Sequence, residues 1–265
     1  MSGPEGPEAP GAGFLSRGWA VFPPDAGSRA WAGPAAIEAA RLLADAGVVG
    51  ADLRCGGTWF PGVNLLANDA RGAIAEAGVP PLDGAAVAFA TEGLGFDEIA
   101  WDRGQLSVCW PGYPKRGAEE TEANHRYRLK RDAAHVDGLL RDAARRRFPG
   151  EAHAFILGLP LSEADWEAAP FVVWEGSHEI VRTALADRFA GVPPADWPRT
   201  DVTEAYHAAR REAFARCPRR VVHAPPGGAY VVHRLALHGV APWRSPGAGY
   251  RAIAYFRPDP FPEAD

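Results

Sequence analysis

The chain of 265 residues is 47% hydrophobic, which is enough to bury a sizeable core in one large domain or two small ones. Its net charge of −5 comes from acids and bases mixed along the whole sequence, so no broad basic surface exists to attract nucleic acid. No stretch approaches the roughly 20 continuous apolar residues that cross a bilayer, and the N-terminus has no secretory-signal pattern, so we expect a cytoplasmic protein without a membrane partner.

Several common catalytic and structural signatures are absent from the sequence. It contains no P-loop, no G-x-S-x-G nucleophile motif and no dinucleotide-binding G-x-G-x-x-G. The cysteines Cys55, Cys109 and Cys217 are widely spaced without a C-x-x-C pair, which argues against a disulfide framework and against a structural zinc site. We therefore expect ordinary buried thiols.

The N-terminal region predicts a tail followed by a helix. Residues 1–12 are nearly all Gly, Pro, Glu, Ala and Ser, which cannot bury enough apolar surface to offset the ordering entropy, so we expect a disordered tail. A helix is predicted from Pro34 to about Ala46, because proline suits the first helical position and Gly47 can end the helix. The sequence shows no repeat and no long linker, so residues 13–265 are expected to form one domain.

From Gln105 onward, short apolar or alternating runs are separated by glycine and proline. Such runs are typical of β-strands, and they read QLSVCW, AHVDGLL, HAFILGLPL, FVVWEGS, RRVVHA, GAYVVHRLAL and YRAIAYF. Many short strands with few helices between them predict an antiparallel sandwich or barrel. A helical insertion is expected at about residues 179–217, where Asp201 and Glu204 form a capping pattern and Pro218 follows the end of the helix.

A histidine and a carboxylate two positions apart form a candidate metal-binding pair. His135 and Asp137 would share one face of a predicted strand, so both could reach a single metal ion. A second imidazole from elsewhere in the chain would complete a 2-His-1-carboxylate triad, which leaves half of an octahedral coordination sphere open. The pair alone is weak evidence, because an H-x-D sequence often arises by chance.

The C-terminal segment supplies a second histidine and an unusual arginine. His238 is expected near the end of an apolar strand, where Gly239 relieves crowding beside it. Arg251 opens the strand that returns beside His238, and its guanidinium could grip the carboxylate of a dicarboxylic ligand through two hydrogen bonds. His233 lies five residues before His238 and would face the opposite way in a continuous strand, so we expect a structural role for it.

The specificity of these motifs lies in their order along the chain. The ordered set comprises GWAVFP at 18–23, the H-x-D pair at 135–137, HAFILGLPL, PFVVWEGSH at 170–178, HRLALHG at 233–239, and Arg251. This set resembles the phytanoyl-CoA dioxygenase family of iron(II)/2-oxoglutarate oxygenases. The resemblance covers residues 105–258 well and the N-terminal third loosely.

The resemblance implies a mainly β fold with flanking helices (α+β), a double-stranded β-helix, also called a jelly roll, which is cupin-like. It implies that His135, Asp137 and His238 hold Fe(2+) and that Arg251 binds the co-substrate 2-oxoglutarate, with O2 as the oxidant. The implied reaction is hydroxylation or desaturation of a small molecule, coupled to decarboxylation of 2-oxoglutarate to succinate. One position departs from the family pattern, because Val240 stands where a hydroxyl residue often assists the carboxylate grip.

The identity of the substrate cannot be deduced from the sequence. Trp110, Tyr113 and Lys115 precede the first candidate ligand and are candidate substrate residues, although core packing explains Trp110 equally well. Loops and insertions determine specificity in such folds, so we expect it to lie in residues 50–116 and 179–217. The sequence carries no signal of oligomeric state.

Two other functional interpretations remain open. A cupin-like metalloenzyme would share the β architecture but would not use 2-oxoglutarate, and Arg251 distinguishes it from the oxygenase. A non-catalytic jelly-roll protein for binding or sensing would keep the fold alone. The complete ligand set argues against that interpretation, because a binding module has little need for an open metal site.

Overall fold

The computed structural model describes residues 11–96 and 98–259. Most of the predicted tail, residues 1–10, lies outside the described residues, and Gly11 and Ala12 form a turn that leads into the first helix. The helices with α-helical geometry are α1 (Phe14–Arg17), α2 (Ala26–Ala44), α3 (Ala46–Ala51), α4 (Ala85–Ala88), α5 (Glu122–Arg131), α6 (Ser177–Phe189) and α7 (Thr203–Arg216). Short 3-10 or π turns occur at Cys55–Gly57, Ala75–Ala77, Phe89–Gly93 and Pro194–Arg199.

The strands form two sheets and a small ribbon, and every pair of neighbouring strands is antiparallel. The larger sheet has the order β1 (Trp19–Phe22), β9 (Ala229–His233), β6 (Phe155–Pro160), β11 (Arg251–Phe256), β3 (Gln105–Cys109) and β2 (Trp59–Phe60). The smaller sheet has the order β10 (His238–Val240), β7 (Phe171–Trp174) and β8 (Arg219–Val222). The ribbon pairs β4 (Leu139–Arg141) with β5 (Arg147–Pro149).

Alternation of side chains along each strand divides the core into layers. Along β11, Ile253 and Tyr255 belong to the core between the two sheets, whereas Ala252 and Ala254 belong to the core on the outer face of the larger sheet. Residues from the smaller sheet, Phe171 and others, complete the central layer. The two sheets therefore enclose an interior, and the odd-numbered positions of β11 face into it.

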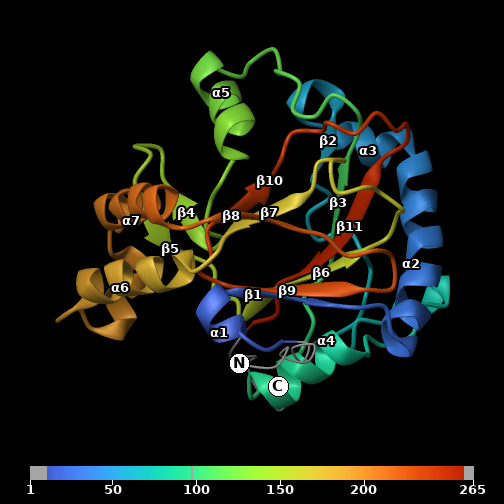
Figure 1. Ribbon diagram of the computed structural model, residues 1–265, viewed down its shortest axis with the longest axis horizontal. Helices are drawn as coiled ribbons and strands as arrows, with labels where there is room; N and C mark the ends of the chain where they lie inside the picture. Colours follow the sequence, from blue (N-terminus) through green and yellow to red (C-terminus); the bar gives the residue numbers. More distant parts are fainter. Residues whose placement is uncertain (1–10, 97, 260–265) are drawn as a thin grey trace, which may run out of the picture.

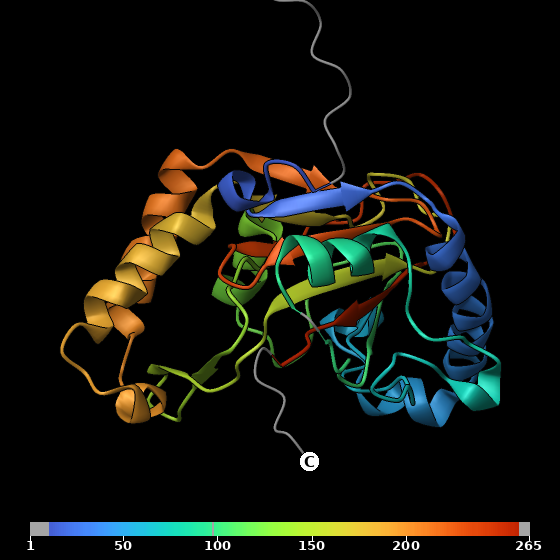
Figure 2. The ribbon, with the colours of Figure 1, turned by 90° about the horizontal axis from the view of Figure 1, so that it is seen from below.

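Helices cover the outer faces of both sheets. Trp31 and Ala35 of α2 pack against the larger sheet, and Val181 of α6 and Tyr206 of α7 pack against the smaller one. In both ribbon views α2 lies at one end of the molecule, and α6 and α7 lie at the opposite end (Figures 1 and 2). Antiparallel sheets with flanking helices confirm the expected fold class and the jelly-roll architecture.

The predicted start of the first long helix was wrong. Helix α2 begins at Ala26 rather than Pro34, and Pro34 lies inside it. The Asp25 side chain accepts hydrogen bonds from the backbone N–H of Ser28 at 2.9 Å and from that of Ala85 at 3.1 Å. This N-terminal cap starts the helix two turns before the proline, which the neighbouring packing then accommodates.

The segment that was expected to be a helical insertion contains α6, a 3-10 turn and α7. Cys55 and Cys109 are buried and Cys217 is half-buried, and all three are free thiols, as predicted. Within the described part of the chain, no helix is both long and apolar enough to cross a membrane.

Candidate metal centre

The segment that carries His135 and Asp137 is a loop and not the predicted strand. His135 makes one isolated antiparallel bridge to His238, with backbone N–H to oxygen distances of 2.8 and 3.0 Å in the two directions. Asp132 and Ala133 have positive φ values of 52° and 54°, so the chain cannot run straight through them. The loop therefore follows α5 directly. It contacts the smaller sheet at His135 and also at Asp132, whose carbonyl oxygen accepts a hydrogen bond from the backbone N–H of Val240 at 3.0 Å.

His238, the partner of His135 in this bridge, does not lie near the end of a strand as predicted. Strand β9 ends at His233, the chain turns, and His238 opens the separate strand β10. A Cβ atom on Gly239 would lie 2.1 Å from the carbonyl oxygen of Asp132, so only glycine lets the loop approach β10 so closely. Gly239 thus relieves crowding beside His238, as expected, and brings the two segments together.

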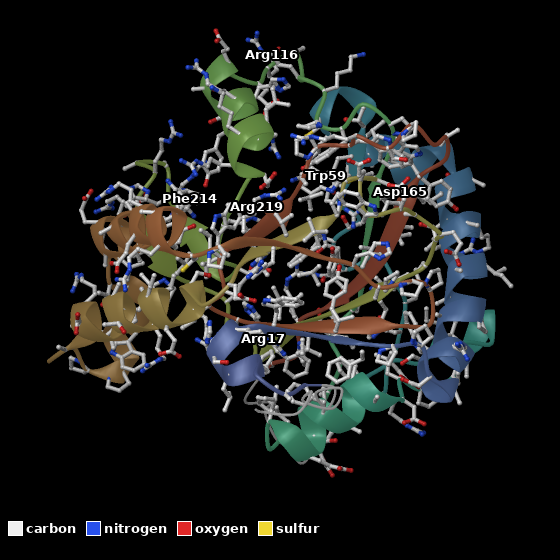
Figure 3. The ribbon with its side chains drawn as sticks, in the orientation of Figure 1. Arg17, Trp59, Arg116, Asp165, Phe214 and Arg219 are labelled. Carbon is white, nitrogen blue, oxygen red and sulfur yellow. The ribbon has the colours of Figure 1, made fainter. Side chains whose placement is uncertain are left out.

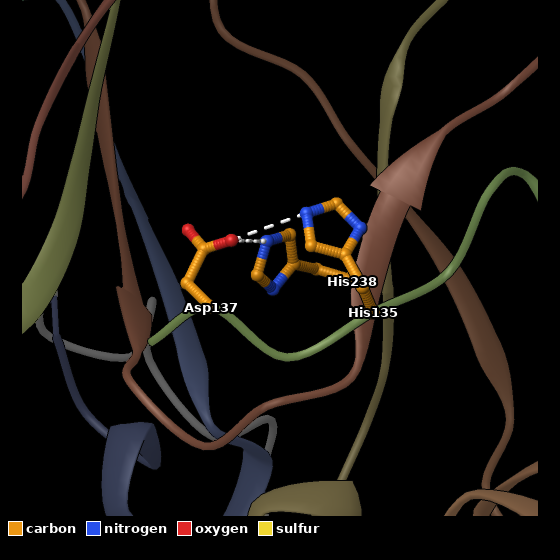
Figure 4. A group of neighbouring side chains, drawn as sticks. All are labelled: His135, Asp137 and His238. Carbon is orange, nitrogen blue, oxygen red and sulfur yellow. Dashed lines mark ion pairs between the residues drawn. The ribbon is translucent and has the colours of Figure 1, made fainter. Parts of the chain in front are cut away.

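Three candidate ligand side chains converge at this contact, as Figure 4 shows. Asp137 Oδ1 lies 3.1 Å from His135 Nε2 and 3.6 Å from His238 Nε2. The three ligand atoms all lie within 4.8 Å of one another. The structure therefore brings together the three residues that the sequence singled out, although two of them come from a loop.

Both imidazoles have one nitrogen occupied by the backbone. His135 Nδ1 lies 3.0 Å from the carbonyl oxygen of Ala133, and His238 Nδ1 lies 2.9 Å from that of Ala236. A carbonyl oxygen only accepts hydrogen bonds, so each Nδ1 carries the proton in the neutral ring. Each Nε2 is then left with a lone pair, and both lone pairs are available in the cluster.

The pKa values of the three clustered side chains are shifted by burial and by neighbouring charges. Burial by itself would raise the pKa of the Asp137 carboxyl, but Arg257 and the two histidines hold that pKa well below its usual range. Burial lowers the pKa of His238, and the nearby carboxylate does not compensate for it. For His135 burial is again the largest single cause and acts to lower the pKa, but the hydrogen bond to Asp137, the charge of Asp137 and the contact with the Ala133 carbonyl together raise it.

The cluster lies on the wall of a cavity of about 460 Å³. Besides the three candidate ligands, the lining residues that bear polar groups include Arg54, Asn64, Asp102, Gln105, Ser107, Glu151, His153 and Arg257. Aromatic side chains of Trp59, Phe171 and Tyr255 complete much of the wall, and Trp59 is labelled in Figure 3. Such a cavity is large enough for a small organic molecule.

The predicted substrate residues Trp110, Tyr113 and Lys115 are not among the residues that line this cavity. Tyr113 is buried with Cys55 and Cys109, and Trp110 packs against the main core. The chain turns away from the cavity after β3, and Trp59 of β2 lies on its wall instead. Of the two segments expected to set specificity, 50–116 contributes to the wall and 179–217 does not, because its helices pack on the outer face of the smaller sheet.

Arg251 is deeply buried at the start of β11 and faces the interior between the sheets. Its Nη2 donates to Cys109 Sγ at 3.4 Å, and its Nε and Nη1 have no hydrogen-bond partner among the described residues. It lines a second, small cavity with Tyr230 and Phe171. The volume of about 20 Å³ is enough for roughly one water molecule. Phe171 lines both cavities and therefore stands between them.

Arg257 is a site residue that the sequence analysis missed. It follows β11, and its Nε donates to Asp137 Oδ2 at 2.6 Å. The strand pattern could have revealed it, because every second residue of a strand points to the same face, and position 257 therefore shares the face of 251, 253 and 255. Tyr255 belongs to the same face, and its hydroxyl accepts a hydrogen bond from the hydroxyl of Tyr230 at 2.9 Å.

Two other histidines, His178 and His233, have structural contacts, and a structural role was expected for His233. His178 is fully buried, and its Nε2 lies 2.9 Å from the carbonyl oxygen of Leu15. His233 Nδ1 accepts a hydrogen bond from the backbone N–H of Leu235 at 3.1 Å, within the turn that separates β9 from β10. Their ring centroids lie 4.7 Å apart.

No protein-family sequence profile matches the chain, and no curated protein matches its sequence.

Solved structures do share its fold. AviO1 from Streptomyces viridochromogenes Tue57 is 16% identical with a TM-score of 0.50, and the match covers 95% of each chain. EctD from S. alaskensis with bound Fe is 20% identical over 93% of this chain and 74% of that one, with a TM-score of 0.46. SnoK, described as a non-heme alpha ketoglutarate dependent carbocyclase, is 13% identical over 96% and 87%, with a TM-score of 0.42. At these identities the likeness shows the fold alone, and the match to AviO1 is the one that supports it.

Proposed function

We propose that the chain is an iron(II)- and 2-oxoglutarate-dependent oxygenase that hydroxylates or desaturates a small molecule, as the sequence resemblance implies. The observation that carries this proposal is the convergence of His135, Asp137 and His238 on the wall of the large cavity. Membership of the phytanoyl-CoA dioxygenase family, and the roles of the individual site residues, are part of the proposal.

The donor set fits a divalent iron ion. Two neutral imidazoles and one ionised carboxylate form the facial triad that is typical of non-haem Fe(II) oxygenases, and it leaves three coordination positions open. The protonated Nδ1 atoms are held by the carbonyls of Ala133 and Ala236, which orients the Nε2 lone pairs in advance. The ring of Phe171 stacks on that of His238 at a centroid distance of 5.3 Å and limits its rotation.

Arg251 fits the distal carboxylate of 2-oxoglutarate. A buried guanidinium with two nitrogens that have no partner among the described residues is costly, and the negative charge of a carboxylate would compensate for it through charge-assisted hydrogen bonds. The space beside Arg251 is smaller than a carboxylate, so it must enlarge before a carboxylate can bind there. The Tyr255 hydroxyl, which accepts from Tyr230 and keeps its own proton to donate, offers a replacement for the hydroxyl that Val240 lacks.

When bound, the iron and 2-oxoglutarate supply dioxygen activation coupled to release of succinate and carbon dioxide. The residues of this chain would hold the metal, the co-substrate and the substrate. Asp137 supplies a negative charge that partly neutralises the metal, Arg251 neutralises the distal carboxylate, and the cavity wall holds the substrate and excludes water.

A second candidate function is a cupin-like metalloenzyme that does not use 2-oxoglutarate. The observation that favours it is the small space beside Arg251, which must enlarge before a carboxylate can enter. In that case the three ligands would still bind a metal, and Arg251 would be a structural residue paired with the thiol of Cys109.

The test compares the purified protein with D137A and with R220Q, which removes a surface ion pair between Arg220 and Glu175. We expect the wild type and R220Q to bind one Fe(II) and to bind 2-oxoglutarate only when the metal is present. In air both should form succinate, and the rate should increase when the metabolite panel includes the substrate. D137A should lose metal binding. Metal binding without any 2-oxoglutarate binding would support the second candidate, and a wild type that binds no metal would overturn both.

A further inference from the structure

The two oxygens of Asp137 have different environments. Oδ1 faces the histidines, at 3.1 Å from His135 Nε2 and 3.6 Å from His238 Nε2. Oδ2 instead accepts a hydrogen bond of 2.6 Å from Arg257 Nε. One oxygen is thus turned toward the cluster and the other is occupied by a cation.

Arg257 is itself held in place by three other groups. Its Nη1 donates to Gln105 Oε1 at 2.7 Å, and its backbone N–H donates to Asp102 Oδ1 at 2.6 Å. Its guanidinium lies 5.7 Å from the centre of the Tyr255 ring. Gln105 is fixed in turn by a hydrogen bond of 2.9 Å from its Nε2 to the carbonyl oxygen of Pro61. The guanidinium therefore cannot follow the carboxylate if Asp137 rotates.

We propose that Arg257 is a positioning residue that restricts Asp137 to binding the metal through one oxygen. This inference rests on the proposed function. A free carboxylate can bind a metal through one oxygen or through both, whereas a carboxylate with one oxygen in a charge-assisted hydrogen bond keeps only the other for the metal.

The number of oxygens bound decides how many coordination positions stay open. Two imidazoles and one carboxylate oxygen occupy three positions of an octahedron and leave three. A 2-oxo acid that bound through its carboxylate and its keto oxygen would take two of them, and one would remain for dioxygen. If Asp137 bound through both oxygens, only two positions would remain, so loss of Arg257 should weaken binding of the co-substrate more than binding of the metal.

Arg219 provides a matched control. Its Nε donates to Asp132 Oδ2 at 2.6 Å, so it forms the same kind of ion pair with the same loop, three residues before His135. Arg219 lies on β8 and is labelled in Figure 3. R219L therefore removes an arginine–aspartate pair from this loop without touching Asp137.

The experiment uses the full chain as wild type, R257L and R219L, all loaded with a divalent metal without oxygen. Difference infrared spectra with 13C-aspartate report how the Asp137 carboxylate binds, because the separation of its two stretching bands is wide for one bound oxygen and narrow for two. Calorimetry gives the affinity for the metal and then for 2-oxoglutarate. If R257L does not fold, R257K, with a shorter donor, serves in the same comparison.

We expect a wide band separation in the wild type and in R219L, and a narrow one in R257L. The affinity of R257L for 2-oxoglutarate should fall at least tenfold more than its affinity for the metal, within the range of about 10- to 100-fold seen when groups that orient ligands are removed. Unchanged bands in R257L, or equal losses in R257L and R219L, would overturn the positioning role. A wild type that binds no metal would instead overturn the proposed function.

Discussion

Arg251 and Arg257 lie at the two ends of β11, and only one of them is paired with an acidic side chain in the described part of the chain. Arg257 is paired with Asp137, whereas Arg251 contacts only the thiol of Cys109 and leaves two nitrogens without a partner among the described residues. A buried cation without an anion costs several kcal/mol unless a ligand compensates for it. The two residues should therefore respond differently to substitution.

Replacement of Arg251 by leucine should separate stability from ligand binding. We expect R251L to raise the free energy of unfolding of the ligand-free protein by about 1–4 kcal/mol, because a buried charge is replaced by an apolar side chain. Its affinity for 2-oxoglutarate should fall by about 1.5–3 kcal/mol, or about 10- to 150-fold, because a charge-assisted hydrogen bond is lost. Urea denaturation and calorimetry on the metal-loaded protein measure the two effects, with R220Q as the control.

An unchanged affinity of R251L for 2-oxoglutarate would exclude Arg251 as the anchor. In that event Arg257, which lines the large cavity, is the other arginine of this face that a carboxylate could reach.

At the scale of single elements, side-chain caps decide where helices begin. Asp25 accepts from Ser28 N–H at the start of α2 and also from Ala85 N–H at the start of α4, so one carboxylate caps two helices. Hydrogen bonds from these groups outweigh the effect of burial and lower the pKa of Asp25. Sequence patterning identified this helix but not its first turns, because the cap precedes the apolar periodicity.

Removal of the Asp25 side chain should destabilise the fold more than removal of an ordinary cap. We expect D25A to lower the free energy of unfolding by about 2 kcal/mol, the upper end of the usual range for N-caps, because two helix starts lose their acceptor. Asp45 caps only the short helix α3, so D45A should cost about 0.5–1 kcal/mol. Chemical denaturation of both variants decides the point, and equal losses would contradict a double cap.

At the scale of the whole molecule, two buried neutral histidines link folding to pH. Burial is the main cause that lowers the pKa of His153 and of His233 from 6.5 to about 4. For His233 the neighbouring charges of His178 and Arg234 act in the same direction, while Glu179 opposes them only partly. Both rings must lose their proton when the chain folds in mildly acidic solution.

The stability should therefore decrease as the pH falls. In the unfolded chain these two histidines bind protons below about pH 6.5, whereas in the folded chain they do so only near pH 4. Their contribution to stability is therefore fully present above pH 6.5 and is lost progressively between these values. H233N keeps an acceptor for Leu235 N–H but cannot be protonated, so its midpoint of thermal unfolding should depend less on pH than that of the wild type. H223Q, at an exposed site, should behave as the wild type, and a slope unchanged by H233N would contradict this account.

Much of the fold could be predicted from the sequence because strand periodicity is local. A residue's alternation between two faces is encoded by its immediate neighbours, so the runs from Gln105 to Phe256 predicted antiparallel strands, and all seven contain strand residues in the structure. In AHVDGLL the strand β4 begins only at Leu139, and His135 lies in the loop before it, where the apolar residues Ala134 and Val136 pack against the smaller sheet and its helices.

The sequence by itself determined the fold class and the order of His135, Asp137 and His238 along the chain, since both are properties of local pattern and residue type. Only the tertiary structure decided that Arg257 contacts Asp137 across 120 positions, that Trp59 rather than Trp110 lines the cavity, and that Phe171 separates this cavity from Arg251. The physical reason is that the packing of the two sheets face to face determines which side chains contact one another. Residues far apart in the sequence then share one buried space, and no local pattern specifies which of them meet.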